Sequence, residues 1–415
     1  MKKGRGGRWA FWEAVAGGAL LLLFLAGATL AIAPGADETA SITQKREDHP
    51  LWHGQLTGAR LDRRMEAFSV AFEHREAPAR LFGTFLDQIG VERIIHYIEG
   101  ENPACHGALH ALGAALVERT EDLKSAMMLC GNACTFACVH GAITHALATA
   151  LPKQDEGIFP RNRKTEALLQ REVLSLCRED SQTVRDFFSG NCAHAVGHGF
   201  AERSADLSLA KADCALFPDA ERHYYCESGV FMELRPILAE KIYQGESSRS
   251  RRREIALRFC IENSEWPSAC LRFFLEPMRR PEEIDALRSR CGALDGPARR
   301  GCFHTLGYIS RDYVASQPEE INRVCRSDRS DDPSDPVFCI SGLAFVKKNH
   351  RLKEKLERAC GFLMDAALKE VCDDQHRRSY YQVDNRIMRS MLSDTKSISP
   401  ADGAGHPSRS GYSRD

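Results

Sequence analysis

The stretch Cys291-Gly-Ala-Leu-Asp-Gly-Pro-Ala-Arg-Arg-Gly-Cys302 places a loop rich in glycine between two cysteines. Glycine and proline at this density indicate a turn. The segment that Cys302 opens, Cys302-Phe-His-Thr-Leu-Gly, has the apolar spacing of a helix. In an antiparallel helical hairpin the end of one helix lies beside the start of the next. A disulfide, which needs a Cα separation of about 5.5 Å, can therefore staple such a turn.

The same arrangement recurs along the chain from Cys177 onward. A helix-like segment ends at the first cysteine of each couple, as in Leu352–Cys360, and another begins at the second. Most couples are separated by 20–22 residues, and the gap of 33 residues contains a polar insert. The regular spacing predicts six local disulfides: Cys177–Cys192, Cys214–Cys226, Cys260–Cys270, Cys291–Cys302, Cys325–Cys339 and Cys360–Cys372.

Four cysteines precede this series. Cys138 resembles a second-position cysteine, because Cys138-Val-His140-Gly141 echoes Cys192-Ala-His194, which favours the pairs Cys130–Cys138 and Cys105–Cys134. An alternative remains open, since the spacing of Cys130, Cys134 and Cys138 would align three thiols on one helix face, as a metal cluster requires.

A helix–Cys–loop–Cys–helix unit with a period in the thirties predicts an all-α fold, an α-solenoid of disulfide-stapled hairpins. In period and hairpin arrangement, residues 61–381 resemble the tetratricopeptide-like and Sel1-like superfamily, including its cysteine-rich secreted members. The resemblance implies a protein-interaction module that presents a concave helical surface to a partner.

The N-terminus predicts a membrane anchor. Residues 14–36 carry no charge over 23 positions, which is long enough to cross a bilayer, and a cluster of basic residues lies immediately before them. The expected organisation is a cytoplasmic basic segment (1–13), a transmembrane signal-anchor (14–36), a polar tether (37–60), the repeat domain (61–385) and a disordered tail (386–415). Sixteen cysteines agree with a periplasmic or other extracytoplasmic location for the bulk of the chain.

Composition excludes some classes of function. The formal net charge is −1, so no overall field favours nucleic acid. The chain has no nucleophile elbow, phosphate-binding loop, His-Glu-x-x-His or dinucleotide fingerprint, and the sequence gives no positive indication of an enzyme.

Histidines recur with the repeat. His110, His194 and His304 open His-Ala-Leu-Gly-like tetrapeptides, and His145 opens the similar His-Ala-Leu-Ala. Histidines four residues apart share one helix face, whereas five residues turn about 140°. The candidate metal ligands are His106, His110, His140, His145, His194 and His198.

Two interpretations of these histidines stay open. A residue that repeats in a repeat protein commonly packs one unit on the next, with Gly113, Gly197 and Gly307 allowing close approach, and this interpretation is favoured. The other is a transition-metal or haem site, although no Cys-x-x-Cys-His haem attachment motif is present.

The expected function is therefore a membrane-anchored scaffold that binds another protein of the cell envelope. The alternative is a metal- or haem-binding protein, with redox activity as one option.

Overall fold

The structure is a computed structural model of the 415-residue chain. It describes residues 44–74, 77–101, 105–150, 173, 175–177, 187–327, 333–345, 350–378, 382–383 and 385–393. The chain divides into two units, Met1–Asp48 and His49–Asp415. All helices named below belong to the second unit.

Every regular element in the described part of the chain is a helix. The elements are α3 (Pro50–His53), α4 (Gly58–Glu73), α5 (Pro78–Ile89), α6 (Val91–Glu101), α7 (His106–Thr120), α8 (Leu123–Cys130), α9 (Ala133–Ala150), α11 (Ser189–Ser204), α12 (Leu207–Cys214), α13 (Ala220–Tyr243), α14 (Arg249–Asn263), α15 (Pro267–Phe274), α16 (Pro281–Gly292), α17 (Gly296–Ser316), η1 (Pro318–Glu320), α18 (Ile321–Val324), α19 (Ser334–Leu343), α20 (His350–Cys360), α21 (Ala366–Arg377) and α22 (Asn385–Leu392).

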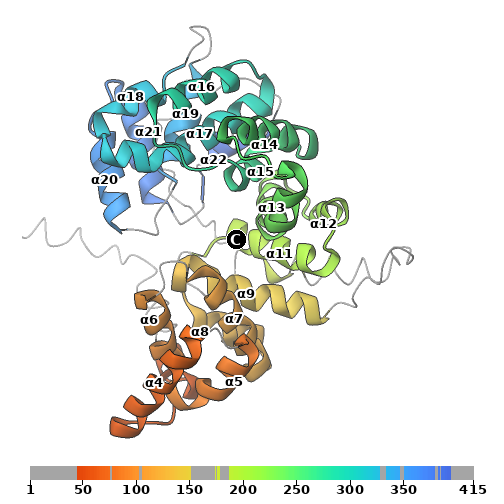
Figure 1. Ribbon diagram of the computed structural model, residues 1–415, viewed down its shortest axis with the longest axis vertical. Coiled ribbons are helices and arrows are strands. Elements are labelled where there is room, and N and C mark those ends of the chain that lie inside the picture. Colours follow the sequence, from red (N-terminus) through yellow and green to blue (C-terminus); the bar gives the residue numbers. More distant parts are fainter. Residues whose placement is uncertain are drawn as a thin grey trace, which may run out of the picture. The chain divides into compact units, whose positions relative to one another are not determined.

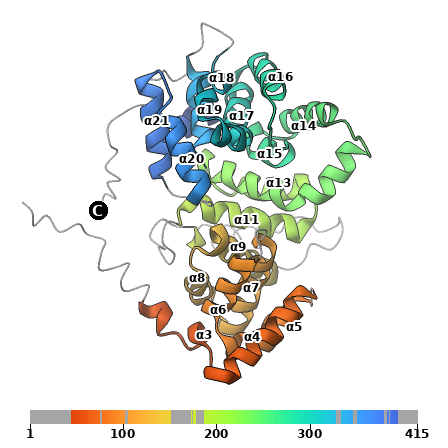
Figure 2. The same ribbon diagram turned by 60° about the vertical axis from the view of Figure 1, so that its left-hand side comes forward.

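Alternate helices form one continuous series of contacts. Each member of the series packs on the next one. The members, in order, are α5, α7, α9, α11, α13, α15, α17, α19 and α21. The intervening helices α8, α12, α14 and α16 each join a neighbouring member as the other arm of a hairpin. Figures 1 and 2 both show α9, α11 and α13 as successive neighbours. The fold is thus all-helical and repeat-like, as the cysteine spacing predicted.

All sixteen cysteines lie in the described residues, and all form disulfides in the predicted pairs. The Cα separations range from 5.3 Å in Cys130–Cys138 to 6.1 Å in Cys105–Cys134, as disulfide geometry requires. The alternative of a thiolate metal cluster is wrong, because these four cysteines are bonded to each other. Cys134 also adopts φ 42°, so it does not continue the helix face of Cys130. The pairs are Cys105–Cys134, Cys130–Cys138, Cys177–Cys192, Cys214–Cys226, Cys260–Cys270, Cys291–Cys302, Cys325–Cys339 and Cys360–Cys372.

Three helix crossings in the series are built on paired glycines. A Cβ added at Gly197 of α11 would lie 2.0 Å from the Cys226 carbonyl oxygen of α13. One added at Gly229 of α13 would lie 1.9 Å from the His194 carbonyl oxygen of α11. The α7–α9 and α17–α19 crossings repeat this reciprocal contact with Gly113 and Gly141 and with Gly307 and Gly342. Only glycine leaves room for backbones this close.

The predicted signal-anchor at residues 14–36 lies outside the described residues. Among those that are described, no helix is both long and apolar enough to cross a membrane. Eight disulfides indicate an oxidising, extracytoplasmic compartment for the folded part.

Two short helices lie where the sequence predicted irregular segments. Within the expected tether, α3 packs on α5 and α6 and buries Trp52. Within the expected tail, α22 packs on α13, α17 and α19, and Ile387, Met388 and Met391 are buried there. In both cases a few large apolar side chains in a polar sequence are sufficient for docking onto the preceding helices.

Candidate metal centre

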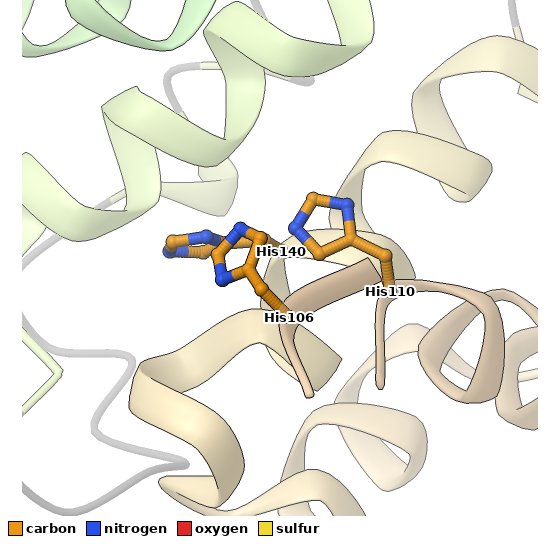
Figure 3. A group of neighbouring side chains, drawn as sticks. All are labelled: His106, His110 and His140. Atoms are coloured by element: carbon orange, nitrogen blue, oxygen red, sulfur yellow. The ribbon is translucent and has the colours of Figure 1, made fainter. Parts of the chain in front are cut away.

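Five of the six predicted histidines come together where α7, α9 and α11 follow one another. His106 and His110 are one turn apart on α7, and His140 is on α9. Figure 3 shows their three rings turned toward one another. His194 and His198 enter from α11, and their ring centroids lie 5.3 and 5.8 Å from that of His140.

His145 does not join this group. Its Nε2 lies 3.5 Å from Oε1 of Glu118, and the side chain is partly exposed. The angular argument from the sequence therefore holds: five residues along α9 turn His145 away from the face that carries His140.

The most buried part of the cluster is the trio His140, His194 and His198, whose relative exposures are 0, 3 and 1%. One ring nitrogen from each lies within 4.8 Å of the other two. The Nε2 atoms of His194 and His198 are 3.2 Å apart. Two ligands of a tetrahedral ion with bonds of about 2.0–2.1 Å lie roughly 3.3 Å apart, so this separation suits a shared ion.

The opposite nitrogens of these two rings are held by side chains of α13. Nδ1 of His198 is 2.7 Å from Oε2 of Glu233, and Nδ1 of His194 is 2.7 Å from Oγ of Ser228. An ionised carboxylate only accepts, so His198 donates from Nδ1. The hydrogen bond lowers the pKa of Glu233, although burial opposes it, and so keeps its charge.

Ser228 connects His194 to the backbone of α13. Its hydroxyl donates to the Tyr225 carbonyl at 2.7 Å and can accept from Nδ1–H of His194. In that tautomer both Nε2 atoms present lone pairs to each other, as a shared ion needs; in the other tautomer Nε2–H of His194 donates to Nε2 of His198. Outer partners of this kind orient metal-binding histidines generally.

A second trio, His106, His110 and His140, shares one member with the first. Its nitrogens also approach within 4.8 Å of one another. The ring centroids are 4.6 Å apart for His106 and His110, and 5.9 Å apart for His110 and His140. Both ring nitrogens of His140 are buried without a hydrogen-bond partner. A buried polar group without a hydrogen-bond partner lowers folding stability by about 1–3 kcal/mol, so His140 destabilises the fold unless a ligand binds it.

Burial keeps three histidines of the cluster neutral. It lowers the pKa values of His110, His140 and His194 well below the usual value, and the neighbouring histidines lower them further. Neutral imidazole is the form that binds a metal. These three therefore offer lone pairs at a pH where free histidine is partly protonated.

The third glycine crossing, between α17 and α19, has the recurring histidine but no histidine cluster around it. His304 occupies there the position of His110 and His194, and its carbonyl meets Gly342. It is buried, lies 5.4 Å from the Phe345 ring centroid, and burial together with nearby Arg272 lowers its pKa to about 3. It belongs to no group of potential metal ligands among the described residues. His304 thus shows the recurring histidine in a packing role alone.

The remaining histidines of the cluster do not recur. His106, His140 and His198 correspond to Arg300, Ser341 and Tyr308 at the third crossing. These three additional histidines, placed around the two recurring ones, make the cluster. They are the observation that packing does not explain.

Sequence reasoning missed Glu233 and Ser228. Both lie on α13, more than thirty residues from their histidine partners, so no helical spacing links them. The repeat offered one signal for Ser228, because Cys226-Glu-Ser228-Gly229 aligns with Cys138-Val-His140-Gly141. Another group, Cys360, Cys372 and His376, has suitable distances, but its sulfurs form a disulfide.

Comparison with known proteins adds no relative: no family model, no curated protein and no solved structure matches this chain.

Proposed function

We propose that this chain is an extracytoplasmic metal-binding protein whose centre is the trio His140, His194 and His198. The observation that carries the proposal is His140, which is fully buried between four other imidazoles while neither of its ring nitrogens has a hydrogen-bond partner. A bound ion satisfies such a nitrogen.

The ligand chemistry favours a borderline transition metal. Imidazole nitrogens suit zinc, copper, iron and nickel, whereas magnesium and calcium prefer oxygen. Copper(II) binds most tightly to nitrogen ligands among the divalent ions, and zinc(II) suits a tetrahedral site. Haem fits less well. A porphyrin must separate its two axial imidazoles, yet Nε2 of His194 and Nε2 of His198 are 3.2 Å apart.

The test is metal binding by the full chain purified in detergent. After chelator treatment that leaves the disulfides intact, equilibrium dialysis against zinc(II) or copper(II) should load the protein, as elemental analysis would detect. His140→Ala should abolish loading. His304→Ala is the matched control, because it removes an equally buried histidine outside the cluster and should leave loading unchanged.

Folding of the variants is checked by circular dichroism and disulfide mapping. If His140→Ala does not fold, the double variant His194→Ala/His198→Ala replaces it. Absence of tight binding in the wild-type protein, or unchanged binding in the cluster variants, contradicts the proposal.

The N-terminal sequence and the helical repeats indicate where the proposed centre would lie in the cell. We infer that residues 14–36 anchor the protein in a membrane, with the N-terminus cytoplasmic and the helical repeats, a tetratricopeptide-like or Sel1-like α-solenoid, outside. The uncharged run and the basic residues before it support this topology.

A second candidate function is binding of another envelope protein, and one loop favours it. Phe362 and Met364, between α20 and α21, are 50% and 86% exposed. Asn322 holds the loop through the Phe362 carbonyl at 2.7 Å and the Met364 amide at 3.2 Å. An ordered loop that exposes large apolar side chains suits a protein contact. By contrast, α22 packs on α13, α17 and α19 and buries its own apolar side chains there.

A photo-crosslinking residue at position 364 tests this candidate in living cells. One envelope protein should be captured reproducibly, and the capture should fail from position 370, an exposed site on α21. Equal capture from both positions would remove the support for this function.

A further inference from the structure

We propose that the centre holds two ions and that His140 bridges them as an imidazolate. This inference rests on the metal-binding function proposed above. His140 is the one residue common to the two trios. Imidazole has a nitrogen on each side of the ring, so it can bind one ion through Nδ1 and another through Nε2.

The geometry argues against a single ion with five ligands. The nitrogens of His106 and His110 approach that of His140, and those of His194 and His198 do the same, but the five do not form one group within 4.8 Å. Two pairs of imidazoles, each from consecutive turns of one helix, therefore form two separate trios that share His140. His106 and His110 come from α7, and His194 and His198 come from α11.

The environment of His140 is the independent observation. A neutral histidine in a core normally donates from one nitrogen and accepts at the other. Here neither nitrogen has a hydrogen-bond partner among the described residues, and the side chain has 0% exposure, so bulk solvent does not reach it. One ion satisfies one nitrogen only. Two ions satisfy both.

The proton balance is simple. The first ion binds the nitrogen of neutral His140 that carries the lone pair. The second ion replaces the N–H hydrogen on the other nitrogen, and that proton passes to the solvent. No electron is transferred. The imidazolate contributes one negative charge between the two cations, and the Glu233 carboxylate contributes another behind His198.

Each ion would receive three protein nitrogens. Structural zinc sites have four protein ligands, whereas sites with three keep a position for water or another small ligand. The proposed centre is thus of the open kind. His110 and His198, whose ring centroids are 5.2 Å apart, bring the two halves of the centre close together.

Copper(II) titration of the metal-free full chain, followed by electron paramagnetic resonance, tests the bridge. The first equivalent should give a mononuclear signal with nitrogen hyperfine structure. The second should bind, as elemental analysis would confirm, while the signal falls, because an imidazolate couples the two spins antiferromagnetically. His106→Ala/His110→Ala should bind one ion and keep the mononuclear signal. His145→Ala, on the same helix as His140, should behave as the wild type.

The outcomes are distinct. Two ions with additive, uncoupled signals overturn the bridge, and saturation at one ion overturns the second site, while both leave the proposed metal-binding function standing. No bound ion at all contradicts the proposed function itself.

Discussion

The Nε2 atoms of His194 and His198 lie 3.2 Å apart, while their Nδ1 atoms are held by Ser228 and Glu233. Both outer partners belong to α13, and both inner nitrogens point into a space that His140 closes from α9. When both Nδ1 atoms carry the protons, both inner nitrogens present lone pairs at a separation that suits two ligands of one ion.

Removing the charge behind His198 should weaken metal binding without abolishing it. Glu233→Gln replaces the charged acceptor of His198 Nδ1–H with a neutral amide, which holds the tautomer and orientation of His198 less firmly. Changes to such outer partners typically cost about 10–100-fold in metal affinity. Competition titration with a chromophoric chelator measures this loss. Glu240→Gln, an exposed residue on the same helix, is the control, and equal affinities for the two variants would count against a role for Glu233.

A methyl group at a glycine crossing should destabilise the fold. Gly197→Ala would place a Cβ 2.0 Å from the Cys226 carbonyl oxygen, so α11 and α13 would have to separate. Overpacking of this kind costs about 1–3 kcal/mol or more in the free energy of unfolding. Chemical denaturation of the variant would measure the loss.

The control for this prediction is Gly107→Ala in α7, where an added Cβ meets nothing within 4 Å. A helical glycine replaced by alanine in open space should gain roughly 0.5–1 kcal/mol. If both variants shift stability in the same direction, the close crossing is not what requires glycine.

The metal-free protein should lose stability in mild acid. Because the folded-state pKa values of His110, His140 and His194 are lowered, the unfolded chain binds more protons below about pH 6.5. Each such histidine then lowers the free energy of unfolding by up to about 1.4 kcal/mol per pH unit. Urea denaturation at pH 7.5, 6 and 5 checks the slope. Stability that stays level over this range would show that these histidines titrate normally.

The buried ion pair between α17 and α19 should be costly to break. Arg299 and Asp335 have side-chain exposures of 3% and 0%, and Nε of Arg299 donates to Oδ1 of Asp335 at 2.8 Å. Asp335→Asn leaves the guanidinium buried without its counter-charge, for which a loss of about 3–5 kcal/mol is expected.

The exposed pair Lys353–Glu357 provides the comparison. Glu357→Gln should change the free energy of unfolding by about 0.5 kcal/mol or less. Thermal or urea denaturation measures the free energy of unfolding of both variants. Similar small losses in the two would show that other groups compensate the charge of Arg299.

The six disulfides from Cys177 onward could be predicted from the sequence because each joins segments close in the chain, whereas the first four cysteines left a metal cluster open. Even the pairing of Cys105 with Cys134 followed once Cys130 and Cys138 were matched as a hairpin couple. The helix period also separated His140 from His145 correctly. Such inferences depend only on local geometry, and local geometry is what a single sequence encodes most directly.

The convergence of the histidines depends on the order in which helices stack, and the sequence did not show this. His106 and His198 are on α7 and α11, and only the direct packing of α9 on both helices brings them to His140. The third crossing refines the packing interpretation: His304 supports packing for the recurring position, and the non-recurring histidines require another explanation.

The short helices α3 and α22 were missed for a different reason. Both lie in polar stretches, and their docking depends on single large side chains such as Trp52 and Met388. The average composition of a segment does not reveal a single large side chain. That side chain is buried only because the neighbouring helices provide a surface for it.

The most direct test of the metal centre is anomalous diffraction from crystals of the zinc-loaded protein, recorded on both sides of the zinc absorption edge. The account predicts a peak about 2.0–2.1 Å from nitrogens of His140, His194 and His198. Unchanged imidazole contacts without any anomalous peak in the cluster, in crystals that bind zinc elsewhere, would contradict it.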